Sequence, residues 1–127
     1  MINKESDVFS LVASKLREKH KNIYVVGTEL TSTPPHFPAV SLVQTNNMVK
    51  TEYSTFNSLE TVVREDYKAE VFSNLEKGKE AQTMEITADI SDAFASLDYE
   101  RTFCEVIPNG DATVNRRVSR YTKNNVI

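Results

Sequence analysis

The side chains best suited to metal binding or to thiol chemistry are His20, His36 and Cys104. A thiol beside an imidazole can act as a nucleophile, and a cluster of thiols and imidazoles can bind zinc. These three residues are scattered along the chain, and none has the short spacing of a zinc site. A Cys104–His pair brought together by the fold is one alternative. We favour the other, in which Cys104 is a small apolar residue of a strand. We therefore expect no catalytic residue and no metal site.

Carboxylates are numerous, since the chain has 18 Asp and Glu residues, and close pairs arise without any acid–base role. We interpret pairs such as Glu65 with Asp66, or Asp89 with Asp92, as solvated surface. A phosphate-binding loop needs clustered glycines, whereas the three glycines of this chain lie far apart. The sequence therefore predicts no cofactor and no enzymatic activity.

A cluster of positive charge lies near the C-terminal end of the sequence. Strand alternation would place Arg116 and Arg120 on one face, together with Val114 and Val118. Arginine on an otherwise apolar strand face indicates a buried or interfacial ion pair, because its guanidinium can hold a carboxylate through two hydrogen bonds. The alternative is a solvated edge strand whose charges protect it against aggregation. The whole cluster consists of Arg116, Arg117, Arg120 and Lys123.

Aromatic residues interleave with this cluster, which raises the question of nucleic-acid binding. Stacking on bases is one interpretation, and packing across a hairpin is the other. The formal net charge of −3 gives no reason to expect general attraction to phosphates, so we favour packing. The aromatic residues concerned are Tyr99, Phe103 and Tyr121.

The elements that must position these residues begin with an amphipathic helix over residues 6–19, where Val8, Val12 and Leu16 recur at helical spacing. A short β-type run and a proline-rich loop follow. The next segments are a strand over 39–45, a long polar loop over 46–58 and a strand from about residue 61. In that last strand, Val63, Tyr67, Ala69 and Val71 alternate with charged residues.

Gly78 interrupts the strand pattern, and a second helical stripe follows it. The chain then ends in two β-type runs, over 98–107 and 112–122, which flank Asn109-Gly110. That pair readily adopts the positive φ angles of a tight hairpin turn. The order α-β-β-β-α-β-β predicts a single α+β domain over residues 1–127, with a mostly antiparallel sheet and two helices packed on it. The stripe is formed by Ile86, Ile90, Ala93, Phe94 and Leu97.

Composition agrees with one ordinary globular domain, since 39% of the residues are hydrophobic and 26% are charged. A single cysteine cannot form an internal disulfide, which fits a reducing cytosol. The N-terminus lacks the apolar core of a signal peptide, and no segment approaches the length of a membrane span. We expect a soluble protein without a membrane partner.

Several stretches taken together resemble one family. They are residues 66–74 (DYKAEVFSN), Gly78-Lys79 with the apolar positions after it, residues 98–103 (DYERTF) and residues 117–121 (RVSRY). In combination they are similar to the tail-terminator proteins of long-tailed bacteriophages, also called tail completion or head-tail joining proteins. The resemblance covers nearly the whole chain in element order and is most specific from Tyr67 to Tyr121.

The resemblance implies a small structural subunit that forms a six-membered ring on the finished tail tube, stops its growth and offers a docking surface to the head connector. Its partners would be other copies of itself, the tail tube protein and a head-completion or connector protein. DNA would pass through the lumen without specific binding. The location would be the virion, at the head-tail junction of the tail, and the host cytoplasm during assembly.

A closed ring needs two different contact surfaces on each subunit. We expect one on the polar loop and the other on the last strand. The alternatives are a head-closure or connector-adaptor protein of the neck and, in a third class, a small phage-encoded enzyme or regulator. The expected interface residues are Asn46, Asn47, Met48, Val49, Lys50, Arg116, Arg117, Arg120 and Tyr121.

Overall fold

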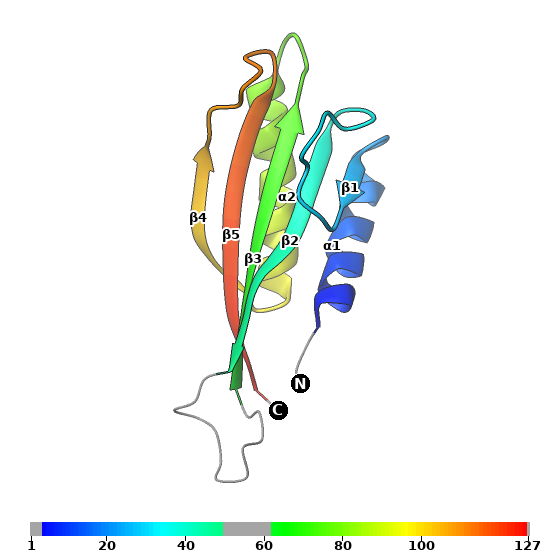
Figure 1. The fold of residues 1–127 in the computed structure, drawn as a ribbon. Coiled ribbons are helices and arrows are strands. Elements are labelled where there is room, and N and C mark those ends of the chain that lie inside the picture. Colours follow the sequence, from blue (N-terminus) through cyan, green and yellow to red (C-terminus); the bar gives the residue numbers. More distant parts are fainter. Residues whose placement is uncertain (1–3, 50–61, 127) are drawn as a thin grey trace.

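A computed structural model describes residues 4–49 and 62–126 of the chain (Figure 1). The predicted α+β order is confirmed, with two helices and a five-stranded sheet. The elements are α1 (Glu5–Lys19), β1 (Tyr24–Val26), β2 (Ala39–Val49), β3 (Val62–Ser73), α2 (Lys79–Ser96), β4 (Glu100–Val106) and β5 (Asn115–Val126).

The strands lie in the order β1-β2-β3-β5-β4, with β3 at the centre of the sheet. Only β1 and β2 pair in parallel, and the other three strand pairs are antiparallel. The sheet is therefore mostly antiparallel, as predicted. Strand β4 was expected to pair with the last strand, and it does so at one edge of the sheet.

Both helices form because their apolar residues recur on one side and can be buried together. Val12 and Leu16 of α1 are almost completely buried, as are Ile86, Ile90 and Phe94 of α2. All of them belong to one core cluster that also contains residues of four strands. The two helices consequently cover the same face of the sheet, which we call the helix face.

Alternation along β3 sorts its side chains between the two faces of the sheet. Tyr67, Ala69 and Val71 are buried in the core cluster against the helices. The residues between them point to the opposite face, because successive side chains of a strand lie on opposite sides. We call this opposite face the open face, since neither helix covers it.

Strand β2 is longer than the sequence predicted. Residues 46–49 were expected to begin a polar loop, but Asn46 to Val49 continue the strand and pair with β3 from Asp66 to Val63. A register shift between Gln44 and Asn46 accommodates one extra residue at this point. Backbone pairing with a strongly alternating neighbour outweighs the low β propensity of these polar residues. Lys50 and the rest of the expected loop lie outside the described residues.

The tight hairpin turn expected at Asn109-Gly110 is wrong. Strands β4 and β5 are joined by residues 107–114, and neither Asn109 nor Gly110 has a positive φ. Asp111 shapes the connection instead, because its Oδ1 accepts hydrogen bonds from the backbone N–H and the hydroxyl of Thr113, at 2.9 and 2.7 Å. Gly78, in contrast, does have a positive φ of 87°, immediately before α2.

Replacing Phe94 with Ala tests the packing of α2 on the sheet. Its ring is fully buried and lies 4.3–5.5 Å, centroid to centroid, from three tyrosines of the core. We expect Phe94→Ala to lower the free energy of unfolding by about 3–5 kcal/mol, measured by urea denaturation. The control is Met84→Ala on the same helix, where a 59% exposed side chain predicts a change within about 0.5 kcal/mol. Equal effects of the two variants would contradict this packing.

Candidate functional site

The residues considered for thiol or metal chemistry lie on separate parts of the fold. His20 Nε2 is 2.7 Å from Oδ2 of Asp89, and His36 packs edge-on against Tyr24. Cys104 lies in the edge strand β4, in register with Ser119. Within residues 4–49 and 62–126, no group of three His, Cys, Asp or Glu side chains is arranged to hold a metal ion. Neither helix of this part of the chain has the length and apolarity to span a membrane.

The open face brings together four of the residues expected at an interface. Asn46 and Met48 of β2 lie in register with Asp66 and Arg64 of β3, whose side chains point to the open face. Arg116 and Arg120 of β5 are in register with Phe72 and Lys68, on the same face. Two regions that are distant in sequence therefore lie on the same face of the sheet.

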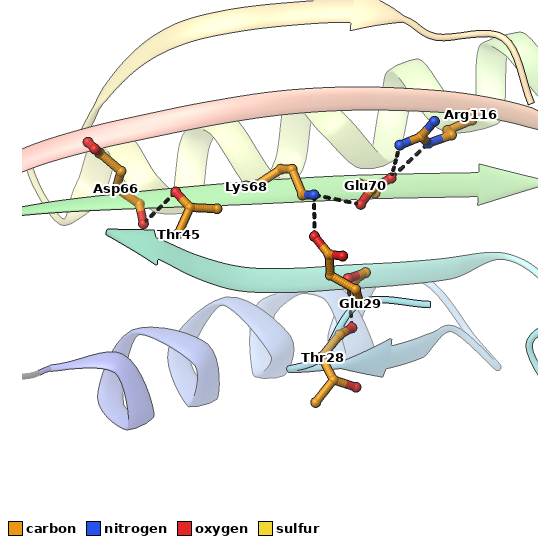
Figure 2. A network of polar contacts seen from close by, with 8 residues as sticks. Thr28, Glu29, Thr45, Asp66, Lys68, Glu70 and Arg116 are labelled. Atoms are coloured by element: carbon orange, nitrogen blue, oxygen red, sulfur yellow. Dashed lines mark hydrogen bonds and ion pairs between the residues drawn. The ribbon is translucent and has the colours of Figure 1, made fainter. Parts of the chain in front are cut away.

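The upper part of the open face, near the start of β5, contains a network of ion pairs (Figure 2). Arg116 reaches the same carboxylate oxygen of Glu70 with its Nε at 2.7 Å and with one terminal nitrogen at 2.5 Å. Lys68 contacts the other oxygen of Glu70 at 3.2 Å and Glu29 at 2.5 Å. The ion pair predicted for an arginine on this strand face is confirmed for Arg116.

This network fastens the segment that follows β1 to the open face. Glu29 belongs to that segment, and its neighbour Thr28 accepts a 2.8 Å hydrogen bond from Ser41 of β2 through its carbonyl oxygen. Ser41 is fully buried as a result. The hydrogen bond and charge of Glu29 raise the pKa of Lys68 despite the opposing effect of burial, so the ammonium remains charged.

A groove of about 460 Å³ lies beside this fastened segment. Its walls come from residues 30–37 and from the connection between β4 and β5, with Phe72 of the sheet between them. Asp111 contributes a carboxylate whose pKa is lowered by its hydrogen bonds to Thr113. The described residues place no imidazole, thiol or ammonium group in this lining.

The rest of the open face is free of the fastened segment, and we call it the open half. Met48 is exposed to 48%, and Arg64 forms a partly exposed ion pair with Asp66 at 3.2 Å. Arg120 is exposed, its side chain has no hydrogen bond or ion pair with any described residue, and Phe103 of β4 lies beside it. The open half includes Asn46, Met48, Arg64, Asp66, Phe103 and Arg120, and also Thr122 and the exposed Glu100, which lie in register with Asp66.

Asp66 is held in place from three sides. Burial alone would raise the pKa of its carboxyl, but hydrogen bonds from Thr122, Asn46 and Arg64 outweigh burial and lower it. The Asn46 amide donates to Oδ2 at 3.1 Å, and the Thr45 hydroxyl donates to the Asp66 carbonyl oxygen at 3.3 Å (Figure 2). The carboxylate thus fixes the end of β2 against β3.

Three other expected interface residues do not belong to the open face. Tyr121 is 1% exposed, and its ring stacks on Phe94 in the core, so it offers no surface to a neighbouring subunit. Arg117 lies on the helix face, and its buried Nε has no hydrogen-bond partner among the described residues. Asn47 lies in register with Glu65, which is also on the helix face. Alternation alone separates Arg117 and Tyr121 from Arg116 and Arg120.

One carboxylate that the sequence analysis assigned to the solvated surface, that of Glu65, is buried in the structure. Glu65 is fully buried beneath the aromatic core. It accepts hydrogen bonds from the Tyr99 hydroxyl at 3.2 Å and from the Gln44 amide at 3.1 Å. Its position between Val63 and Tyr67, two residues from each, was the available signal, because those positions share the buried side of β3.

Comparison of the chain with family models finds no match, and comparison with curated proteins finds none either.

Replacing Glu70 with Gln tests the ion-pair network. The change leaves Lys68 and Arg116 without their shared carboxylate at a site where Glu70 is only 6% exposed. We expect the free energy of unfolding to fall by about 1.5–3 kcal/mol at neutral pH, measured by urea denaturation. The matched control is Glu105→Gln, an exposed carboxylate of β4, with an expected change within about 0.5 kcal/mol. If Glu70→Gln has the same free energy of unfolding as the parent, the attraction within the ion pairs only offsets the cost of removing their charges from water.

Asp66 gives a prediction for pH dependence. A carboxyl whose pKa is lower in the folded state stabilises the fold above its unfolded pKa of about 3.9, and this contribution is lost as the pH falls through the folded pKa. Asp66→Asn should therefore be less stable than the parent at pH 7, and the difference should disappear between about pH 4 and pH 2. Urea denaturation of both proteins at a series of pH values measures it. A difference that stays constant down to pH 2 would refute the assignment.

Proposed function

We propose that this chain is a structural subunit of a bacteriophage or prophage tail, of the tail-terminator kind. It assembles into a six-membered ring on the end of the tail tube, stops tube growth and forms the joint to the head connector. The proposal starts from the resemblance of residues 66–121 to that family, and the α+β order agrees with it.

The observation that carries an assembly role is the open half of the sheet. A strand face without a helix leaves Met48 of β2 exposed near one edge and Arg120, whose side chain pairs with no described residue, beside the ring of Phe103 near the other edge. Met, aromatic residues and Arg are the types enriched in protein interfaces, whereas Lys and Glu are depleted there. A chain whose core occupies only one side of its sheet has the other side available for a partner.

The projecting shape of the sheet supports the same interpretation. Figure 1 shows the ends of β2, β3 and β5 that lie near residues 49, 62 and 126 extending beyond the helix layer. Paired strands that project from a body can reach a neighbouring subunit without moving the core. The acidic net charge is compatible with DNA sliding through a lumen without sticking to it.

A neck protein of the head-closure or connector-adaptor type is the second candidate, because it would use the same kind of ring-forming surface. The two roles differ in what is bound. A terminator binds the open end of a tail tube, whereas a head-closure protein binds filled heads that lack tails.

Electron microscopy of phage lysates tests the proposal directly. A stop codon in place of the Lys4 codon removes the protein, and a plasmid copy of the gene provides the complementation control. We expect abnormally long tails detached from filled heads, because nothing then ends tube growth. Tails of normal length that fail to join heads would replace the terminator role by a neck role. Normal virions would refute both.

A further inference from the structure

The connection between β4 and β5 contains the only asparagine of the sequence that is followed by glycine, Asn109-Gly110. Asparagine is among the chemically labile residues of proteins. The backbone nitrogen of the next residue can attack its side-chain amide and close a succinimide ring. The reaction therefore depends on what surrounds the backbone N–H that follows each asparagine.

Gly110 leaves this nitrogen accessible. Its backbone N–H has no hydrogen bond with any described residue. It has no Cβ, and a Cβ added there would meet no atom of the described chain within 4 Å, its chain neighbours apart. Gly110 is exposed and lies outside both strands. The backbone can therefore turn towards the Asn109 side chain without meeting another group or giving up a hydrogen bond of its own.

The side chain of Asn109 is only weakly held. Its Nδ2 lies 3.5 Å from the carbonyl oxygen of Asp111, which is longer than an ordinary hydrogen bond, and the contact is exposed. Asn109 is itself partly exposed. Water and hydroxide can consequently reach both groups that would react.

A second asparagine lines the same groove beside residues 30–37 and lacks these features. Asn74 is exposed and follows β3 directly. The next residue is Leu75, whose backbone N–H donates a hydrogen bond to the Ser73 hydroxyl at 3.4 Å. Attack on the Asn74 amide would have to break this hydrogen bond, and the branched side chain of Leu75 hinders the approach. The two asparagines differ in the nitrogen that follows them, and both belong to exposed connections.

We propose that Asn109 is a site of spontaneous deamidation. Hydroxide removes the proton of the Gly110 N–H, and the nitrogen then bonds to Cγ of Asn109. The Cγ–Nδ2 bond breaks and ammonia leaves, taking a proton from water and so restoring the hydroxide. One water molecule then opens the succinimide at either carbonyl. Aspartate forms where the bond between Cγ and nitrogen breaks, and isoaspartate forms where the bond between the backbone carbonyl carbon and nitrogen breaks.

The product changes the charge of the groove. Asp111 also lines it, and hydrogen bonds from Thr113 lower the pKa of its carboxyl, which therefore stays ionised at neutral pH. Deamidation adds a second carboxylate and removes the Asn109 amide, the donor that faces the Asp111 carbonyl oxygen. Isoaspartate also lengthens the backbone of the connection. The groove of an aged molecule thus differs in charge and shape from that of a new one.

Peptide mapping by mass spectrometry tests the site in the full-length purified protein. After incubation in a mildly alkaline buffer, conversion at Asn109 should be at least about tenfold faster than at Asn74. Both aspartate and isoaspartate should form at Asn109, because the succinimide opens in two ways. Equal rates at the two positions, or aspartate without isoaspartate at Asn109, would overturn the proposal.

Gly110→Ala is the matched variant, because it places a Cβ beside the attacking nitrogen. Open space around that Cβ and the absence of a positive φ at Gly110 predict an unchanged fold, which circular dichroism and urea denaturation verify. Conversion at Asn109 should slow about tenfold, while the rate at Asn74 stays the same. An Asn109 rate equal to that of the parent would exclude attack by the Gly110 nitrogen.

Incubation of the parent in urea separates the effect of the fold from that of the local sequence. Unfolding releases the Leu75 N–H from Ser73, so the rate at Asn74 should rise by a larger factor than the rate at Asn109. The rate at Asn109 should change less than about tenfold, since the folded chain already leaves this site open. A larger increase at Asn109 would mean that the fold protects it, and the inference would be wrong.

Discussion

The packing of Phe94 against the aromatic rings of the central strands is the interaction on which the rest of the structure depends. It joins α2 to β3 and β5 through Tyr67 and Tyr121, and to the start of β4 through Tyr99. Tyrosine can pack here because its hydroxyl finds a partner at the edge of the core, as Tyr121 does with Ser91 and Ser119. Burial raises the pKa of Tyr121, so this hydroxyl stays neutral.

Because this aromatic packing commits one face of the sheet to the helices, the other face needs a different means of stabilisation. Charges of alternating sign along β3 provide it, with Glu70 shared by Lys68 and Arg116. Neighbouring charges of opposite sign satisfy one another and leave the face without a large field of one sign. The fastened segment after β1 covers only part of this face. Arg120 and Met48 lie outside the covered part and are therefore exposed.

The sequence predicted those parts of the fold that local pattern determines. The apolar spacing of Val8, Val12 and Leu16 identified α1, and alternation from Val63 identified β3, because both patterns report directly on one buried side. It did not predict the extension of β2 through Asn46, since that depends on pairing with a partner strand and not on the residues themselves. Tyr121 is not an interface residue for a different reason: it is next to Arg120 in sequence, but alternation along β5 puts the two side chains on opposite faces.

The sequence predicted the candidate site only in part, because a surface made of β2, β3 and β5 can be identified only when the strand order is known. A two-layer subunit with its helices on one side has two unlike sides, and unlike sides join head-to-tail. Whether a head-to-tail contact gives a ring or an open filament depends on the rotation between neighbours.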